Sequence, residues 1–245
     1  MDAKLDLLIF LPSIFLPNRM KLKHKSTSST KGLTMNEQRR CDSVCSLALL
    51  LGVLGCVLTP GDLSAGPRVD VVVTTGDAAE LERVAAHELK EQFKRLFDAD
   101  VHVGATLPAG PSNLILIGSP DTNPTIKELV KDWPKLSDQG HLVRTFQHEG
   151  KNALVVGGGS PVATLWAVYE LGHRLGIRYV LFGDMYPATP PELNLDGIDI
   201  LLEPALKVRT WRTIDDSPVG PESWGLAEHE RVIKQLAKLK FNRIL

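Results

Sequence analysis

The most regular pattern of apolar and polar positions in the chain lies at residues 151–187. Residues 153–156 form a short apolar run of the kind that fills a buried strand. Three glycines, Gly157 to Gly159, follow the run and allow a sharp turn that side chains would obstruct. Ser160 then stands where a helix N-cap belongs, and Pro161 stands at the first helical position, which has no amide hydrogen bond to lose. The pattern predicts a strand, a glycine turn and the start of a helix.

The residues after Pro161 predict the rest of this unit. Apolar residues recur there at steps of three and four, which places them on one helical face. They are Leu165, Val168, Tyr169, Gly172 and Leu175. Gly176 is a suitable stop for the helix, and residues 177–182 have the composition of the next strand. We expect a strand–helix–strand unit on which the middle of the chain packs.

This ordered combination resembles the end of the non-catalytic α/β domain that precedes the barrel in several exo-acting glycoside hydrolases. The α-glucuronidases and the bacterial β-N-acetylhexosaminidases are the families it resembles most. In both, a glycine-rich turn leads into a helix with a tyrosine and a leucine, then into a Leu-Gly-x-Arg turn and a strand. The matching residues here are Gly157, Gly158, Gly159, Leu165, Tyr169, Leu171, Leu175, Gly176 and Arg178. The resemblance implies a supporting domain rather than a catalytic one.

Residues 66–205 read as one α/β domain. Buried-strand patterns alternate with two long amphipathic helices and one weak helix. The expected strands are 69–75, 101–103, 114–117, 141–147, 153–156 and 178–182, and the expected helices are 78–98, 125–132 and 161–175. This order predicts an α/β (α+β) fold, a two-layer sandwich in which a mixed sheet carries its two main helices on one face. The family resemblance implies the same fold.

Composition narrows the classes of function. The chain carries 28 basic and 29 acidic residues, so its net charge of −1 gives no electrostatic reason to expect a nucleic-acid partner. A hydrophobic content of 43% is too high for a chain that is disordered throughout. The three cysteines, Cys41, Cys45 and Cys56, all lie before residue 60. The rest of the chain can therefore hold neither a disulfide framework nor a cysteine-based metal site.

Residues 1–65 are expected to be a disordered extension and a signal peptide. Met35 precedes a basic stretch at 36–40, an apolar core at 47–58, and small residues that end at Ala65. We expect translation to start at Met35, and we expect a secreted or periplasmic mature chain from about Gly66 with no stable membrane span after cleavage. A retained membrane anchor is the alternative, and a lipoprotein at Cys56 is a weaker one.

Three patterns that suggest chemistry have structural alternatives. The dinucleotide fingerprint would need a glycine where Val162 stands, and the P-loop lysine is missing, so the glycine turn predicts no cofactor. The seven histidines contain neither His-x-His nor His-Glu-x-x-His, so no metal site is expected, and His87 and His173 are expected in solvent. Asp215 and Asp216 are adjacent, whereas paired glycosidase carboxylates lie ~5–10 Å apart across a substrate bond. Turn residues are the favoured interpretation, and we assign no catalytic residue.

Residues 206–245 read as the opening of a (β/α)₈ barrel. A strand is expected at 207–214, a helix at 226–240 and a second strand at 241–245. The sequence Leu-Lys-Phe-Asn at 239–242 resembles the start of the second barrel strand in the same families. Arg209, five residues after Pro204, resembles the arginine that binds the terminal sugar in hexosaminidase-type enzymes. The family's next motif, Gly-Leu-x-x-Asp, is absent at 210–214, which favours a salt-bridged surface arginine as the alternative.

Together these patterns predict the N-terminal part of a secreted carbohydrate-active hydrolase. A barrel needs ~250 residues and places its chemistry on loops after several strands, so we expect this chain alone to be inactive. We also expect residues 206–245 either to dock loosely or to make the protein prone to association. The alternatives are a stand-alone secreted carbohydrate-binding or interaction module, in which Trp166, Trp211 and Trp224 could stack on sugar rings, and a nucleotide-binding protein. Trp166 also fits a core position.

Overall fold

The computed structural model describes residues 66–73, 80–110, 112–212 and 221–245, without the side chain of Glu222. The expected signal peptide, the three cysteines, His24 and the pair Asp215–Asp216 lie outside the described residues. Within the described residues, no helix has the length and apolar character needed to cross a membrane.

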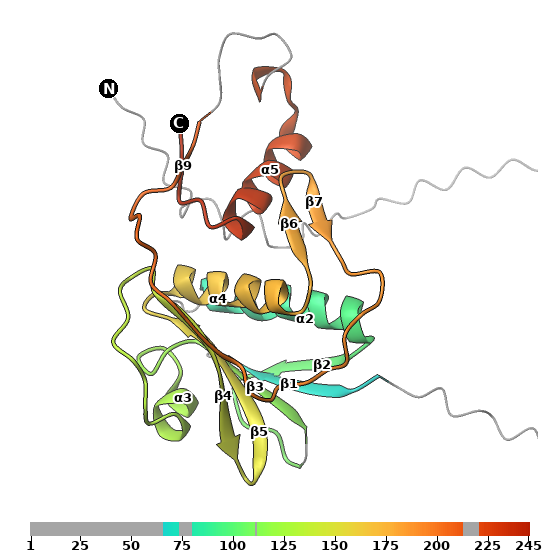
Figure 1. Cartoon of the computed structure of the whole chain (residues 1–245), viewed down its shortest axis with the longest axis vertical. Helices are drawn as coiled ribbons and strands as arrows, with labels where there is room; N and C mark the ends of the chain where they lie inside the picture. Colours follow the sequence, from blue (N-terminus) through green and yellow to red (C-terminus); the bar gives the residue numbers. More distant parts are fainter. Residues whose placement is uncertain (1–65, 74–79, 111, 213–220) are drawn as a thin grey trace, which may run out of the picture. The chain divides into compact units, whose positions relative to one another are not determined.

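A six-stranded mixed sheet forms the centre of the domain (Figure 1). Its strand order is β2-β1-β3-β5-β4-β8. The first four strands in this order run parallel, whereas β4 runs antiparallel to both of its neighbours. The strands are β1 (Arg68–Val72), β2 (Asp100–Gly104), β3 (Asn113–Ile117), β4 (His141–His148), β5 (Lys151–Gly158) and β8 (Asp199–Leu202). The mixed sheet agrees with the prediction.

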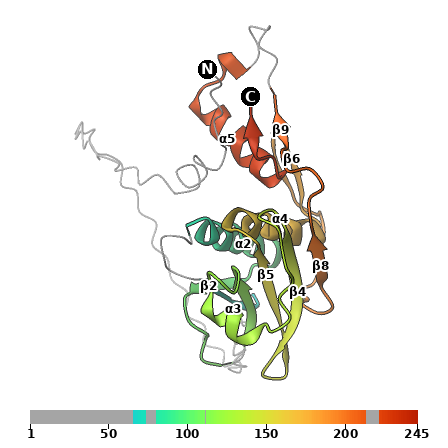
Figure 2. The same cartoon turned by 90° about the vertical axis from the view of Figure 1, so that its left-hand side faces the viewer.

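The two long helices lie on one face of this sheet (Figures 1 and 2). Helix α2 (Glu80–Phe97) and helix α4 (Pro161–Arg174) bury their apolar stripes against the strands, with Phe93 and Tyr169 fully enclosed. Ser160 caps α4 as expected, because its Oγ accepts a hydrogen bond from the Ala163 amide at 3.3 Å. The two-layer arrangement is therefore confirmed.

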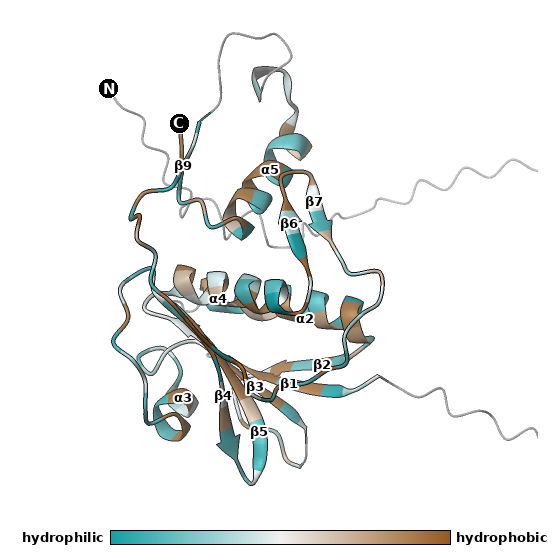
Figure 3. Ribbon diagram, viewed as in Figure 1, coloured by the Kyte–Doolittle hydropathy of each residue, from teal (hydrophilic) through white to brown (hydrophobic). Residues whose placement is uncertain are grey.

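A smaller apolar cluster covers the other face of the sheet. Helix α3 (Pro124–Leu129) contributes Ile126, and Trp133 packs beside it. In β3 successive residues alternate between the two clusters, so Ile115 lies under the long helices and Leu116 lies on the α3 side. Burial on both faces explains why the central strands read as continuous apolar runs. Figure 3 shows the hydrophobic colour along these strands and the hydrophilic colour at the β4–β5 tip.

The glycine turn is required by close backbone approach. A Cβ at Gly157 would lie 1.9 Å from the carbonyl oxygen of Gly118, and one at Gly159 would lie 1.9 Å from that of Ser137. A Cβ at Gly158 would lie 2.5 Å from the Ala163 side chain. None of the three has a positive φ, so the absence of a side chain is what matters here. This geometry supports the structural interpretation of the turn.

The sheet edge departs from the prediction. The segment expected to continue the sheet after α4 forms β6 (Arg178–Val180), which pairs with β7 (Gly183–Met185) in a separate hairpin. Only Tyr179 of β6 is buried, whereas its apolar composition suggested a fully buried strand. The edge is instead β8, whose mostly exposed side chains give no strand pattern in the sequence.

Residues 206–245, here called the C-terminal segment, contain a β–α–β unit. Strand β9 (Thr210–Trp211) pairs in parallel with β10 (Arg243–Ile244), and helix α5 (Leu226–Lys238) connects them after a short 3₁₀ turn, η2 (Pro221–Ser223). The order of elements agrees with the sequence prediction. Within the described residues, both strands are shorter than predicted.

Candidate functional site

A group of part-buried polar contacts lies at the junction between the α/β domain, residues 66–205, and the C-terminal segment. Three basic side chains of the segment reach into the domain: Arg209 ahead of β9, Lys238 at the end of α5, and Lys240 ahead of β10. Helix α5 also buries Leu236 and Ala237. The segment is therefore held by specific buried contacts, and the expectation of loose docking is wrong.

Arg209 ties together three separate stretches of chain. Its Nη1 donates to Gln139 Oε1 at 2.8 Å and to the Leu206 carbonyl oxygen at 2.7 Å, and its Nε donates to the Lys240 carbonyl oxygen at 2.5 Å. The guanidinium carbon lies 4.7 Å from the centre of the Trp166 ring, within range of a cation–π contact. This arginine, the one substrate-binding candidate from the sequence, directs its guanidinium to protein groups. Its role in sugar binding stays a prediction.

The junction lies at the amino-terminal ends of the two C-terminal strands. Arg209 directly precedes β9 and Asn242 directly precedes β10, and the Asn242 side chain accepts a hydrogen bond from the Arg209 amide at 2.8 Å. In (β/α)₈ barrels the chemistry is built on the loops at the carboxyl ends of the strands, and the opposite face contributes stability. The α/β domain thus contacts the amino-terminal side of this β–α–β unit, and the barrel expected from the sequence stays a prediction.

Lys238 forms a buried ionic cluster with two carboxylates. Its Nζ lies 2.6 Å from Asp184 Oδ2 on β7 and 3.3 Å from Glu88 Oε2 on α2. Burial favours the neutral amine, but the two carboxylates outweigh it and raise the pKa of Lys238 above its ordinary value. The cluster joins α2, the β6–β7 hairpin and α5 in one ion network.

Two tyrosines line the same cluster. The Lys238 Nζ lies 5.9 Å from the ring centre of Tyr169 and 5.8 Å from that of Tyr179. Burial and the nearby carboxylates raise the pKa of both phenols, so both stay neutral near pH 7. Neither phenol can therefore supply a phenolate nucleophile at that pH, and the cluster fits a structural role.

A second ionic contact lies close to a buried histidine. Lys240 pairs with Glu170 of α4, and His141, the first residue of β4, is only 1% exposed. His141 Nδ1 lies 3.0 Å from the Gln139 carbonyl oxygen, and the His141 ring meets Trp166 edge-on at 6.4 Å between centroids. Burial is the main reason why the pKa of His141 lies below its ordinary value.

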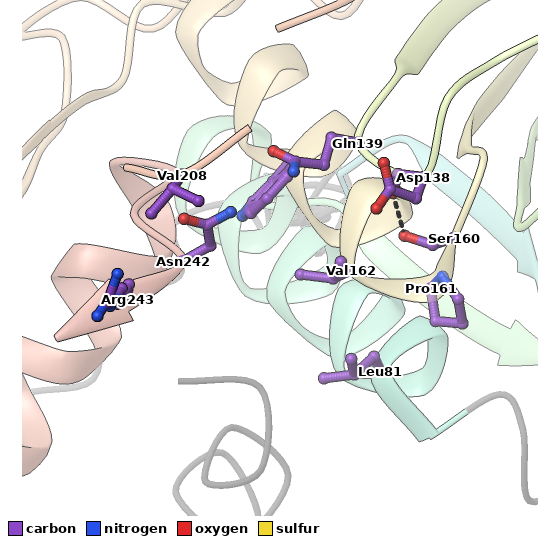
Figure 4. Close-up of a pocket in the computed structure, with 10 residues that line it drawn as sticks. Leu81, Asp138, Gln139, Ser160, Pro161, Val162, Val208, Asn242 and Arg243 are labelled. Carbon is purple, nitrogen blue, oxygen red and sulfur yellow. Dashed lines mark hydrogen bonds between the residues drawn. The ribbon is translucent and has the colours of Figure 1, made fainter. Parts of the chain in front are cut away.

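A hollow of about 580 Å³ opens beside this junction (Figure 4). Asp138 and Ser160 line one side of it, and Val208, Asn242 and Arg243 line the other. The remaining lining residues are Leu81, Gln139, Pro161, Val162 and Trp166. Asp138 is the single acidic residue among these ten, whereas glycoside hydrolysis in most families requires two carboxylates that flank the scissile bond. The hollow therefore lacks the acid pair of such a site.

The other candidate residues are dispersed. Among the described residues, no group of three or more histidine, cysteine, aspartate or glutamate side chains could hold a metal ion. His87 is exposed as expected, but His173 is half-buried against Tyr179, with 4.9 Å between ring centroids. Its expected exposure is wrong, because the β6–β7 hairpin folds back over the end of α4.

The tryptophans do not present a shared platform. Trp166 is 1% exposed and belongs to the core, as one interpretation of the sequence held. Trp211 packs edge-on against Phe241 at 6.0 Å, and Trp224 lies 5.8 Å from His229, between ring centroids. Trp166 is therefore too buried to stack on a sugar ring, as the carbohydrate-binding alternative would require.

Sequence reasoning missed Gln139, Glu88, Asp184 and Lys238 as junction residues. In the sequence, Glu88 and Lys238 look like ordinary charged residues on the exposed faces of helices. Gln139 and Asp184 lie outside any periodic pattern. Periodicity reports which face of an element is apolar, but it does not report which distant charges will meet. No local signal could have found this cluster.

Comparison with known proteins agrees with the resemblance seen in the sequence. Residues 67–171 match the family model described as "Glycosyl hydrolase family 67 N-terminus". A solved structure described as a novel family GH115 4-O-methyl-α-glucuronidase with specificity for decorated arabinogalactans aligns with a TM-score of 0.50 and 16% sequence identity. The alignment covers 71% of this chain and 24% of that one, so the chain spans about a quarter of that relative. At this identity the alignment shows a shared fold.

Among curated proteins, none matches the chain at a significant level. The family match covers α2, α3, most of α4 and every strand of the six-stranded sheet except β8. Residues 67–171 therefore match an N-terminal domain of family 67 glycosyl hydrolases, and the described α/β domain shares its fold with a solved α-glucuronidase.

Proposed function

We propose that this chain supplies the non-catalytic supporting domain of a secreted α-glucuronidase-like hydrolase that acts on uronic-acid-decorated polysaccharides. The observation that carries the proposal is the junction itself. Arg209 bonds to Gln139 and Lys240 pairs with Glu170 on the amino-terminal side of β9 and β10, which would be the structural side of a barrel. In the proposed barrel, the domain would fix the base and leave the opposite face to the chemistry.

The substrate class follows from the relatives. The family match and the solved neighbour both belong to glycoside hydrolases, and the neighbour is described as an α-glucuronidase. This favours a glucuronosyl substrate over the N-acetylhexosamine substrate that the resemblance to hexosaminidases would imply. Carbohydrate would contact the barrel and not the α/β domain, whose hollow carries one acidic residue.

The domain is proposed to contribute no acid or nucleophile of its own. We expect the purified 245-residue chain to release no uronic acid from glucuronosyl oligosaccharides or from aryl α-glucuronides. The measurement is product release followed by chromatography, with a full-length α-glucuronidase as the positive control. Release that persists through purification and disappears in an Asp138→Asn variant would place chemistry in the hollow and overturn the proposal.

Export remains part of the proposal. The basic stretch at 36–40 and the apolar core at 47–58 support a signal peptide that starts at Met35. N-terminal sequencing of secreted protein is expected to begin near Gly66. A mature N-terminus ahead of residue 47 would contradict cleavage.

A further inference from the structure

The buried histidine at the junction is bonded through one ring nitrogen only. His141 Nδ1 lies 3.0 Å from the Gln139 carbonyl oxygen, and a carbonyl can only accept, so Nδ1 carries the hydrogen. Nε2 then holds the lone pair, and it is buried without a hydrogen-bond partner among the described residues. The ring is 1% exposed. A proton added at Nε2 would create a buried N–H group with no acceptor.

Gln139 connects this ring to the C-terminal segment. Its backbone carbonyl accepts from His141, while its side chain accepts from Arg209 Nη1 at 2.8 Å and donates to the Lys207 carbonyl oxygen at 2.8 Å. A single residue thus holds the histidine through its main chain and residues 207–209 through its amide. The hydrogen bond of the His141 ring and the bonds of residues 207–209 therefore share one residue.

The charges around His141 come from four elements. Arg209, ahead of β9, and Lys240, after α5, disfavour a positive charge on the ring. Glu170 of α4 and Glu203, after β8, favour it. Both carboxylates already have partners, because Glu170 pairs with Lys240 and Glu203 accepts from the Ser137 amide at 2.9 Å and from the Ser137 hydroxyl at 2.6 Å. Burial and the two cations outweigh them.

We propose that His141 and Gln139 form a pH-sensitive latch, which holds residues 206–209 and 240–242 on the α/β domain at neutral pH and releases them when His141 takes a proton. Protonation places a third positive charge beside Arg209 and Lys240 and leaves a buried N–H group without an acceptor. Hydration of the ring and a larger distance from these two cations would both relieve the cost of the added charge. The Lys238 cluster contains no histidine, so α5 stays anchored at that end. The latch goes beyond the proposed function and does not depend on it.

Hydrogen exchange on the full chain tests the latch directly. Amide exchange is measured by mass spectrometry at pH 7.5 and pH 5.0, with labelling times adjusted for the intrinsic pH dependence of exchange. If opening of the junction is coupled to the uptake of one proton, its equilibrium constant rises as the pH falls. The rise is up to about tenfold for each pH unit below the ordinary histidine pKa of about 6.5. We expect peptides covering 206–211 and 239–245 to open about tenfold more at pH 5.0, and α2 to stay unchanged.

Two histidine variants make the test specific. His141→Gln carries no titratable ring and is expected to show the same junction exchange at both pH values. His173→Gln is the matched control. His173 is half-buried, lies near Lys240 and has a pKa that burial lowers, as His141 does. This variant is expected to keep the wild-type response. An unchanged wild-type junction, a His141→Gln chain that still responds, or a His173→Gln chain that does not respond would each overturn the latch.

A second measurement covers the case in which His141→Gln does not fold. The titration of the His141 ring is then followed by NMR in the wild-type chain, alongside junction exchange at intermediate pH values. The two midpoints are expected to coincide. A junction that opens with a midpoint different from that of His141 would rule the latch out.

Discussion

Two buried ionisable side chains of the α/β domain respond to pH in opposite senses. Burial raises the pKa of Glu82, whose Oε1 accepts from the Thr122 hydroxyl at 2.7 Å and whose Oε2 lacks a partner among the described residues. Its contribution to stability is complete below the unfolded pKa and is lost as pH rises through the raised folded pKa. Burial lowers the pKa of His141, so its contribution is present above the ordinary histidine pKa and is lost as pH falls through the lowered folded value.

Glu82→Gln is therefore expected to stabilise the domain at neutral pH. The neutral amide keeps an acceptor for Thr122 and removes the cost of a buried charge. The free energy of unfolding, measured with urea at pH 7.5 and pH 4, should exceed the wild-type value at pH 7.5, and the gap should narrow at pH 4. A variant that is less stable than wild type at both pH values would show that the carboxylate makes a favourable contact in the folded state.

The glycine turn gives a second prediction at the scale of a single residue. A methyl group at Gly157 would lie 1.9 Å from the backbone carbonyl of Gly118, so Gly157→Ala forces β5 away from its neighbour. We expect a loss of about 1–3 kcal/mol in the free energy of unfolding, as in overpacked cores. Gly104→Ala is the control, because a Cβ there meets nothing within 4 Å. Equal stabilities for the two variants would contradict the packing role of the turn.

At the scale of elements, the sequence predicted the helices and the central strands well because their patterns are local. The helix expected at 78–98 corresponds to α2, and the strands expected at 141–147 and 153–156 correspond to β4 and β5, which pair as a hairpin. Its two-residue turn, Glu149–Gly150, has positive φ values of 51° and 75°, as hairpin turns of this length require. The glycine turn and the Ser160 cap were also predicted, since both depend on neighbouring residues.

The elements that the sequence did not predict depend on distant partners. β8 joins the sheet through antiparallel pairing with β4, although three of its four side chains are exposed. β6 leaves the sheet because it pairs with β7. The sequence singled out Arg209, but its contacts with Gln139, Trp166 and Lys240 come from three separate stretches of chain. Such pairings are set by tertiary packing and not by periodicity.

The ionic anchor of α5 yields a prediction at this scale. Lys238→Met removes the cation and leaves Glu88 and Asp184 facing each other in a largely buried site. Breaking a buried ion pair in this way costs about 3–5 kcal/mol. We expect the exchange protection of α5 to fall sharply while that of β3 and β5 is kept. Adding Glu88→Gln and Asp184→Asn to Lys238→Met should restore much of the protection, and an unchanged α5 in the single variant would show that the cluster does not anchor the helix.

Arg209 tests the other end of the same junction. Arg209→Lys keeps the charge but loses the forked donor geometry that reaches Gln139, Leu206 and Lys240 together. Arg209→Ala also uncovers Trp166. We expect a junction weakened by about 2 kcal/mol in the alanine variant, the range of hydrogen bonds to charged groups, and by less in the lysine variant. Calorimetry can compare both variants with wild type. Equal melting temperatures for all three chains would show that Arg209 does not stabilise the junction.

For the molecule as a whole, the central claim is that the β–α–β unit is not stable alone and that the α/β domain stabilises it. The unit has two strands of two residues and one helix of 13 residues, a length at which isolated helices are marginal in water. Its three basic anchors, Arg209, Lys238 and Lys240, find their side-chain partners in the α/β domain. These contacts support the proposal that the α/β domain stabilises the β–α–β unit.

The most direct test compares residues 206–245 as an isolated peptide with the same residues in the full chain, by the exchange protection of the α5 amides. The account predicts a protected helix in the full chain and no protection in the peptide, because the peptide has lost Glu88, Glu170, Asp184 and Gln139. A peptide that folds alone with α5 as protected as in the full chain would contradict the supporting role of the α/β domain.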